Sequence, residues 1–387
     1  MDFTNLKTCM DKLIDEHNVP GLDVIVNYDH KEVFRYTRGF SDIENKRKMQ
    51  GNELYDIYSM TKLITCVCAL QLVEKGKISL DDEIFKFLPE FEKMKISEHD
   101  FDDGTKVMTG TGEEKQIKSD FTGFAKNQIT IKHLFTMSAG LDYAIGSDYI
   151  QNAVSSGVKS TREIVKTFSQ TVLGFEPGTR FRYSLCHDVL GAIIEVVSGK
   201  KFGDYMKENV LEPLGMKNTS FDVSNDERVM VKYRKENGVV KKVGQGNWFR
   251  ITDEYQSGGA GLVSTTEDYA LFLDALACGG VGKNGNRVLS EELVKLMGTN
   301  QLSGKALEDF DKLRKGYGYG LGVRTHLDPS SSGSLSPIGE FGWDGAAGAF
   351  ALVDTKNKLS LTYLQQMYGW SMEVQNLIRN ALYSCIK

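Results

Sequence analysis

A serine and a lysine three positions apart, Ser59 and Lys62, are the residues of this sequence whose types and spacing best suit chemistry. Residues three apart share one face of a helix, so the lysine amine can reach the serine hydroxyl one turn earlier. The free N–H groups and positive potential of a helix N-terminus would surround the same hydroxyl. A serine hydroxyl is a weak nucleophile until a neighbouring group takes its proton. The pair therefore predicts acyl transfer with Ser59 as nucleophile and Lys62 as its base.

The alternative interpretation of this pair is a chance match, in which a capped helix start is followed by a solvated lysine. The surrounding sequence argues against it, because residues 60–73 are mostly apolar. A helix of this composition is expected to be central and buried. Burying a lysine without a function would be costly, and a buried charge usually has a partner. The apolar surroundings therefore favour the catalytic interpretation.

The hydrophobic patterns along the chain indicate the elements that position this pair. Helical periodicity is present over 3–17, 59–76, 188–198 and 371–384. Strand-like runs are present over 22–27, 33–36, 349–353 and 359–364, the first two forming a hairpin that turns near Tyr28-Asp29-His30-Lys31. The two ends of the chain therefore supply strands, and the middle is mainly helical.

This distribution predicts a single domain, 1–387, with two lobes. An α/β lobe is expected from approximately 1–58 and 240–387, and a mainly helical lobe from approximately 59–239. A cleft between the lobes is where chemistry is expected. Residues 93–127 are rich in charge and glycine, which indicates an exposed excursion whose role the sequence leaves open.

Long segments of the chain resemble the serine β-lactamase-like and penicillin-binding-protein-like family of serine hydrolases. The segment GFSDIENKRKMQGNELYDIYSMTKLITCVCALQLVEKGKISLDDEIFKFLPEF carries the S-x-x-K motif of that family at Ser59. It is followed in order by ITIKHLFTMSAGL, PGTRFRYS, GAIIEVVSG, LEPLGMKNT, GGAGLVSTTEDYALFL, GYGYGLG and GWDGAAGAFALVD. The resemblance spans nearly the whole chain. It implies an α+β fold of the β-lactamase/DD-peptidase type, with a central antiparallel sheet flanked by helices plus a mainly helical lobe.

The second motif of that family is Y-x-N, whose tyrosine lies beside the serine and lysine. Tyr183-Ser184-Leu185 matches it, so the resemblance implies that Tyr183 is catalytic, although a tyrosine taken alone is more often a packing residue. A phenol or phenolate there would carry the proton from Ser59 to the leaving group, since a nearby cation favours the ionised tyrosine. Leu185 replaces the asparagine that would hydrogen-bond a substrate amide. This departure weakens the case for an amide substrate.

The third motif of the family is K-T-G or a relative, and Trp343-Asp344-Gly345 occupies its place. The glycine would let a substrate approach the strand edge, and the backbone N–H groups of Ala346 and Ser59 would form an oxyanion hole. The missing lysine removes the group that anchors a substrate carboxylate in β-lactamases. A W-x-G motif is similar to the esterase branch of the family, which is related to class C β-lactamases. The plainer alternative is a strand-entry turn with a packed tryptophan.

His187 and Asp188 follow the second motif and suggest a Ser-His-Asp triad with Ser59. Adjacent residues of a helix do not face each other, so Asp188 is poorly placed to orient His187 toward the serine. Asp188 fits better as a helix-start residue. We therefore expect His187 to be a structural residue or one that acts on the site from behind it.

Composition excludes several other classes of protein. With 47 lysines and arginines against 52 acidic residues, the net charge of −5 is too mild to indicate a nucleic-acid partner. The N-terminal residues lack the apolar stretch of an export signal, and no run long enough to span a membrane occurs. Six scattered cysteines and six distant histidines predict reduced thiols, a cytoplasmic location, no metal and no cofactor.

The sequence therefore predicts a carboxylesterase-like serine hydrolase that acts on a small-molecule ester or amide, with the ester favoured. A β-lactamase or a D-amino-acid peptidase or amidase is the nearest alternative. A catalytically silent ligand-binding member of the family is the alternative from another class. The physiological substrate and the oligomeric state stay open.

Overall fold

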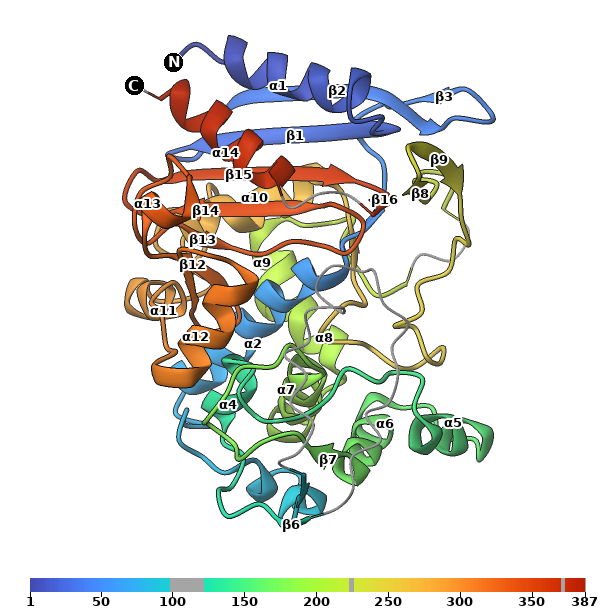
Figure 1. Cartoon of the computed structure of the whole chain (residues 1–387), viewed down its shortest axis with the longest axis vertical. Coiled ribbons are helices and arrows are strands. Elements are labelled where there is room, and N and C mark those ends of the chain that lie inside the picture. The colour runs from blue at the N-terminus through green and yellow to red at the C-terminus, as the bar shows by residue number, and fades with distance from the viewer. Residues whose placement is uncertain (98–121, 223–225, 370–372, 387) are drawn as a thin grey trace.

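The computed structural model describes residues 1–97, 122–222, 226–369 and 373–386. One eight-stranded antiparallel sheet, in the order β11-β12-β13-β14-β15-β1-β2-β3, forms its central layer (Figure 1). The strands are β1 (Gly21–Tyr28), β2 (Lys31–Asp42), β3 (Arg47–Lys48), β11 (Tyr317–Tyr319), β12 (Arg324–His326), β13 (Phe341–Gly342), β14 (Phe350–Asp354) and β15 (Leu359–Gln365). Strand β1 pairs with β15 from Leu22 opposite Gln365 to Tyr28 opposite Leu359, so the sheet joins the two ends of the chain.

Helices cover both faces of this sheet. Helices α1 (Thr4–Asp15) and α14 (Glu373–Ser384) lie together beside the two termini, and α10 (Thr266–Ala277) packs against β1, β14 and β15 (Figure 1). Side chains alternate between the faces of a strand. In β14, Phe350 and Leu352 accordingly join the apolar cluster of α1 and α14, whereas Ala351 and Val353 join the cluster that contains α10. Cover on both faces explains why β14 is buried throughout.

The chain between the strands of the sheet is mainly helical (Figure 1). Its helices are α2 (Thr61–Glu74), α4 (Ile131–Phe135), α5 (Asp148–Ser155), α6 (Thr161–Thr167), α7 (Cys186–Ser198), α8 (Phe202–Met206) and α9 (Glu212–Leu214), with a π-helical turn at Lys207–Leu211. Helix α2 packs against α7 and is buried from Thr61 to Leu72, which confirms the predicted central helix.

Smaller elements complete the structure. Helices α11 (Glu291–Met297), α12 (Gly304–Leu313) and α13 (Pro329–Ser332) precede or follow the outer strands. Short pairings join β4 (Tyr55–Asp56) to β10 (Val263–Ser264), and β8 (Tyr233–Glu236) to β16 (Met367–Tyr368) and β9 (Val239–Lys242). Strand β5 (Lys95–Ile96) pairs with β6 (Gly123–Phe124) and β7 (Val172–Leu173). Strands β5 and β6 bound the predicted excursion, and its residues 98–121 lie outside the described part of the chain.

The predicted α+β architecture is confirmed: an antiparallel sheet flanked by helices is combined with a mainly helical part. Helix α7 begins at Cys186, earlier than the predicted start at Asp188, and its N-cap Leu185 supplies no side-chain hydrogen bond. The start was misplaced because the sequence reasoning expected a polar cap. Among the described helices, none is both long and apolar enough to cross a membrane.

Candidate active site

Ser59 lies in a short 3₁₀ turn, Tyr58–Met60, that leads directly into α2. Tyr58 has a φ of 45°, in the left-handed region that residues other than glycine rarely adopt. Such conformations persist only where the surrounding structure holds them, and they concentrate at functional sites. The Tyr58 hydroxyl is hydrogen-bonded to the Tyr368 hydroxyl, and its ring lies 5.6 Å from that of Trp248. The turn leaves Ser59 partly exposed between the buried residues Tyr58 and Met60.

Lys62 lies one turn further along and is completely buried. Its Nζ donates hydrogen bonds to Ser59 Oγ at 3.2 Å and to the carbonyl oxygen of Gly259 at 2.7 Å. Burial lowers the pKa of Lys62 to about 7, although the negative charge of Asp188 opposes this shift. A substantial fraction of the amine is therefore neutral near pH 7, and a neutral amine can accept the serine proton.

The Asp188 carboxylate and the Lys62 amine both lie beside Gly259. A Cβ atom at Gly259 would lie 2.6 Å from Asp188 Oδ2 and 3.3 Å from Lys62 Nζ, so only glycine fits between them. Asp188 Oδ1 accepts hydrogen bonds from the Tyr255 hydroxyl at 2.7 Å and from Ser257 Oγ at 2.6 Å. Asp188 is in the first turn of α7, as expected, but its carboxylate acts on Lys62. Sequence reasoning missed this contribution.

Tyr183 lies beside Lys62 as the middle ring of a stack of three aromatic rings. Its ring lies 5.4 Å from that of Tyr143 and 5.5 Å from that of Trp343, in near-parallel planes. Trp343 Nε1 donates a hydrogen bond to the Tyr183 hydroxyl at 3.1 Å, and Lys62 Nζ lies 4.6 Å from the centre of the Tyr183 ring.

Burial raises the pKa of Tyr183, and the interactions of its hydroxyl with Ser59 and Trp343 oppose only part of that increase. The sequence argument allowed a phenolate because a lysine cation stands nearby. The structure favours the neutral phenol, since the depressed pKa of Lys62 weakens that cation near pH 7 and the buried site disfavours a phenolate. A neutral phenol can donate its proton.

The third motif is held by an arginine that sequence reasoning did not single out. Both carboxylate oxygens of Asp344 accept hydrogen bonds from Arg314, each at 2.7 Å, and both side chains are buried. The Arg314 guanidinium also lies 4.8 Å from the centre of the Trp343 ring. Asp344 is thus engaged by Arg314 and fixes the turn that follows Trp343.

Gly345 lets this turn approach the serine segment. A Cβ atom at Gly345 would lie 2.5 Å from the carbonyl oxygen of Ile57, two residues before Ser59. No residue in the described ranges accepts a hydrogen bond from the backbone N–H of Ala346 or of Ser59. Backbone N–H groups without a partner of this kind are the type of donor that stabilises the oxyanion of acyl transfer.

Two of the predicted residues make no side-chain hydrogen bond to the reacting groups within the described part of the chain. His187 is completely buried, and neither of its ring nitrogens has a hydrogen-bond partner in the part of the chain that the structure describes. Burial lowers the pKa of His187 well below its ordinary value, so the ring is neutral and linked to neither Ser59 nor Asp188. Leu185 is buried in the main core, and its backbone N–H donates to the carbonyl oxygen of Asp142.

Aromatic rings line the approach from Tyr58 to Tyr183. Tyr58 packs against Trp248, Trp248 against Phe249, Phe249 against Tyr143, and Tyr143 against Tyr183, with centroid separations of 5.4–5.8 Å. Trp248 is 46% exposed, so this apolar series reaches the surface. No pattern in the sequence had marked Trp248 or Tyr143.

Two cations beside these rings share one buried carboxylate. Lys232 Nζ lies 2.5 Å from Asp56 Oδ2, and Arg250 donates to Asp56 Oδ1 at 2.7 Å. Asn247 also donates to Asp56 Oδ1, at 3.1 Å. Asp56 thus holds both positively charged side chains in place.

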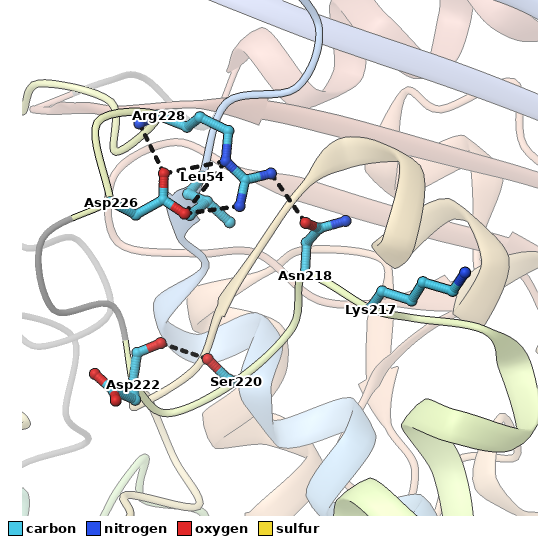
Figure 2. A pocket seen from close by; sticks show the side chains of 7 residues that line it. All are labelled: Leu54, Lys217, Asn218, Ser220, Asp222, Asp226 and Arg228. Atoms are coloured by element: carbon cyan, nitrogen blue, oxygen red, sulfur yellow. Dashed lines mark hydrogen bonds and ion pairs between the residues drawn. The ribbon is translucent and has the colours of Figure 1, made fainter.

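A separate polar hollow of about 200 Å³ lies beside residues 217–228 (Figure 2). The Arg228 guanidinium there pairs with Asp226 at 2.7 Å and donates to Asn218 Oδ1 at 2.9 Å. Its side chains mostly bind one another, and none of the residues predicted for catalysis lines it. The hollow is therefore not part of the candidate site.

A partly exposed serine with a buried lysine three residues later at the start of a central helix, in a domain of this architecture, defines a class of serine hydrolases. A model of the Beta-lactamase family matches residues 6–383, and the chain belongs to that family. The family and fold that the sequence predicted are confirmed.

Individual relatives are similar over the full length. Esterase EstB of Burkholderia gladioli is 26% identical over 408 residues, which cover 98% of this chain and 94% of that protein. The structure of EstCE1, a hydrolase with promiscuous acyltransferase activity, superposes with a TM-score of 0.79 at 24% identity, covering 98% of this chain and 97% of EstCE1. Simvastatin synthase LovD of Aspergillus terreus superposes with a TM-score of 0.79 at 21% identity, covering 99% and 98% of the two chains. These two superpositions extend the fold assignment over nearly the whole chain.

Proposed function

We propose that this chain hydrolyses small uncharged esters through an acyl-enzyme on Ser59. It is a serine hydrolase of the esterase-like branch of its family, and the likeness to Esterase EstB supports this choice. One observation carries the proposal: Ser59 Oγ lies 3.2 Å from the amine of a completely buried lysine whose pKa is lowered to about 7.

In the acylation step, the neutral amine of Lys62 takes the proton of Ser59, and Oγ attacks the ester carbonyl carbon. The carbonyl oxygen becomes negatively charged and accepts hydrogen bonds from the backbone N–H groups of Ser59 and Ala346. Gly259 holds Lys62 in place through its carbonyl oxygen. The buried position of the lysine keeps its amine available near neutral pH.

The leaving alcohol then requires a proton. Tyr183 donates its phenolic proton to the departing oxygen and recovers one from the Lys62 ammonium, so no charge accumulates on the tyrosine. Trp343 holds the Tyr183 hydroxyl in position. Water then attacks the acyl-enzyme with Lys62 again as base, which releases the acid and restores Ser59.

The surroundings of Ser59 favour an uncharged ester over a carboxylate-bearing amide. Leu185 offers no side-chain hydrogen bond to an amide, and Trp343 stands where a lysine would bind a carboxylate. Arg314 is engaged by Asp344. The ring series that ends at the exposed Trp248 is suited to apolar acyl or alcohol groups.

The proposal is tested by offering three substrates to the same enzyme: p-nitrophenyl acetate, nitrocefin and a peptide ending in D-alanyl-D-alanine. We expect turnover of the ester and at most slow turnover of the other two. Preferential hydrolysis of nitrocefin or of the peptide would move the chain to the β-lactamase or peptidase alternative. Turnover of none of the three would support a silent ligand-binding protein.

The nucleophile is tested separately by intact mass after reaction with a fluorophosphonate. The wild-type protein should gain one adduct, and the Ser59→Ala variant should gain none. Ser184→Ala is a matched control, because Ser184 is a buried serine next to Tyr183 whose hydroxyl contacts Cys186 and Met137. An equal adduct on Ser59→Ala would overturn the assignment.

A further inference from the structure

Three side chains that commonly bind metal ions meet outside the candidate active site. His30 Nδ1 lies 2.8 Å from Asp274 Oδ2, and Cys278 Sγ lies 4.0 Å from Asp274 Oδ1. One donor atom from each residue falls within 4.8 Å of the other two. Zinc in proteins takes nitrogen, sulfur and oxygen donors from these residue types. The cluster therefore has the chemistry of a transition-metal site, which the distant histidines and scattered cysteines of the sequence did not suggest.

Two of the three ligands come from the C-terminal end of α10. Asp274 and Cys278 are four residues apart, so the helix presents them on one face. Asp274 is buried, and Cys278 is a partly exposed free thiol. The helix alone therefore places these two ligands close together.

The third ligand comes from the two-residue turn between β1 and β2. Asp29 and His30 have φ values of 45° and 67°, as a type I′ hairpin turn requires. Glycine is common at the second position of such a turn, because other side chains are strained there. The contact between the His30 ring and Asp274 gives the histidine a role that glycine could not fill.

We propose that His30, Asp274 and Cys278 bind one Zn²⁺ ion, with water as the fourth ligand. Metal–ligand bonds of about 2.0–2.3 Å place tetrahedral donor atoms roughly 3.3–3.8 Å apart. His30 Nδ1 and Asp274 Oδ2, now 2.8 Å apart, must separate, and Cys278 Sγ must approach the other two donor atoms from within 4.8 Å. The thiol of Cys278 loses its proton to solvent, and its sulfur binds the ion as a thiolate.

The charges around the cluster are balanced before an ion binds. Asp29 and Asp274 are negative, and the neighbouring cations are Lys358 and Lys31. Lys358 is bonded to Asp29, at 2.9 Å, so it is not directed at the three donor atoms. The ion itself displaces the proton of the Cys278 thiol when it binds.

The bound ion would have a structural role. It would clamp the β1–β2 turn onto α10, beside the existing hydrogen bond from Asn27 to the carbonyl oxygen of Ala270 at 3.2 Å. Tyr269 of the same helix donates a hydrogen bond to the carbonyl oxygen of Met60, next to Ser59. Zinc should therefore raise the thermal stability of the protein. None of the residues proposed to react in ester hydrolysis is among its ligands.

The test uses untagged full-length protein stripped with a chelator and titrated with CoCl₂ and then ZnCl₂. We expect one Co²⁺ per chain with a thiolate-to-cobalt charge-transfer band, displacement by Zn²⁺, and a higher Tm with Zn²⁺. Cys278→Ser should abolish the charge-transfer band. Both Cys278→Ser and His30→Gln should weaken Zn²⁺ binding by more than about tenfold, because even the loss of a residue that only hydrogen-bonds a metal ligand costs about that much affinity.

Cys9→Ser is the matched control, because Cys9 is another partly exposed free thiol, on α1. It should bind both ions as the wild type does, and circular dichroism should show all variants folded. Absence of stoichiometric binding to the wild type would overturn the proposal. Unchanged binding to Cys278→Ser, or equal loss in Cys9→Ser, would overturn it as well.

Discussion

Lys62 Nζ and Asp188 Oδ2 converge on the side of Gly259 where any other residue would carry its Cβ atom. A methyl group at Gly259 would lie 2.6 Å from Asp188 Oδ2 and 3.3 Å from Lys62 Nζ. The carboxylate is anchored by Tyr255 and Ser257, so its charge has a fixed direction relative to the amine. Burial alone would push the pKa of Lys62 further down, and Asp188 limits that fall to about 7. We therefore infer that Asp188 is a positioning residue that raises the pH at which the amine becomes neutral.

Asp188→Asn should move the pH dependence of ester hydrolysis to lower pH. The negative charge of Asp188 raises the pKa of Lys62, so without it the amine becomes neutral at a lower pH. The measurement is kcat/KM for p-nitrophenyl acetate against pH. Asp268→Asn is the control, because Asp268 is also a buried carboxylate whose pKa is raised by burial, and its partners are Asn218 and Thr219. A profile that does not move in Asp188→Asn would contradict this role.

In the wild-type enzyme, kcat/KM for the same ester should rise with pH through about 7 as one proton is lost from Lys62. The direction follows from the lowered pKa: below it the amine is protonated and cannot accept the serine proton, and above it the amine is free. Lys62→Met should reduce kcat/KM by about 10²–10⁴-fold, the usual contribution of a general base. Lys77→Met, at an exposed lysine after α2, should leave activity and profile unchanged. A flat profile in the wild type would contradict the assignment of Lys62 as base.

Whether a site residue could be predicted from the sequence depends on how far it lies along the chain from the residues that it contacts. Ser59 and Lys62 lie within one helical turn, so their spacing alone places them together. Tyr183 and Trp343 were identified through ordered resemblance over the chain, since nothing in their local patterns marks a site. Asp188 and Gly259 meet Lys62 across more than a hundred residues of sequence, and no periodicity reports such a contact.

The same limit applies to larger features of the structure. The strands at the two ends of the chain were predictable because alternating and apolar runs mark them. The central antiparallel sheet was expected from the resemblance, but the order of its strands was not predicted, because strand pairing depends on tertiary packing. The zinc ligands His30 and Asp274 are 244 residues apart, so only the fold reveals the cluster.

Gly259→Ala should cost stability as well as activity. The added Cβ atom meets the anchored Asp188 carboxylate at 2.6 Å, so one of the two must shift. Overpacking a buried site costs about 1–3 kcal/mol, and a displaced Gly259 carbonyl would also lose its hydrogen bond from Lys62. Chemical denaturation and ester hydrolysis measure the two effects. Gly244→Ala is the control, because a Cβ atom there meets nothing within 4 Å, and it should change neither.

Tyr183→Phe should lower kcat by about 10²-fold or more and leave KM nearly unchanged, because it removes the proton donor but keeps the ring stack. Tyr149→Phe is matched to it: Tyr149 is a buried tyrosine whose hydroxyl pairs with Thr171 at 2.6 Å, away from the site. We expect Tyr149→Phe to retain wild-type kinetics whatever it does to stability. Wild-type kcat in Tyr183→Phe would remove the tyrosine from the mechanism.

Arg314→Met should destabilise the protein by about 3–5 kcal/mol, because it leaves the buried Asp344 carboxylate without its partner. The double variant Arg314→Met, Asp344→Asn removes both charges and should recover much of that loss. The activity of the double variant tests the role of the ion pair. If the pair holds the turn from Trp343 to Ala346 against Ser59, the double variant should be folded but less active than the wild type, with kcat lowered more than KM is raised. Full recovery of kcat would show that the turn keeps its place without the pair.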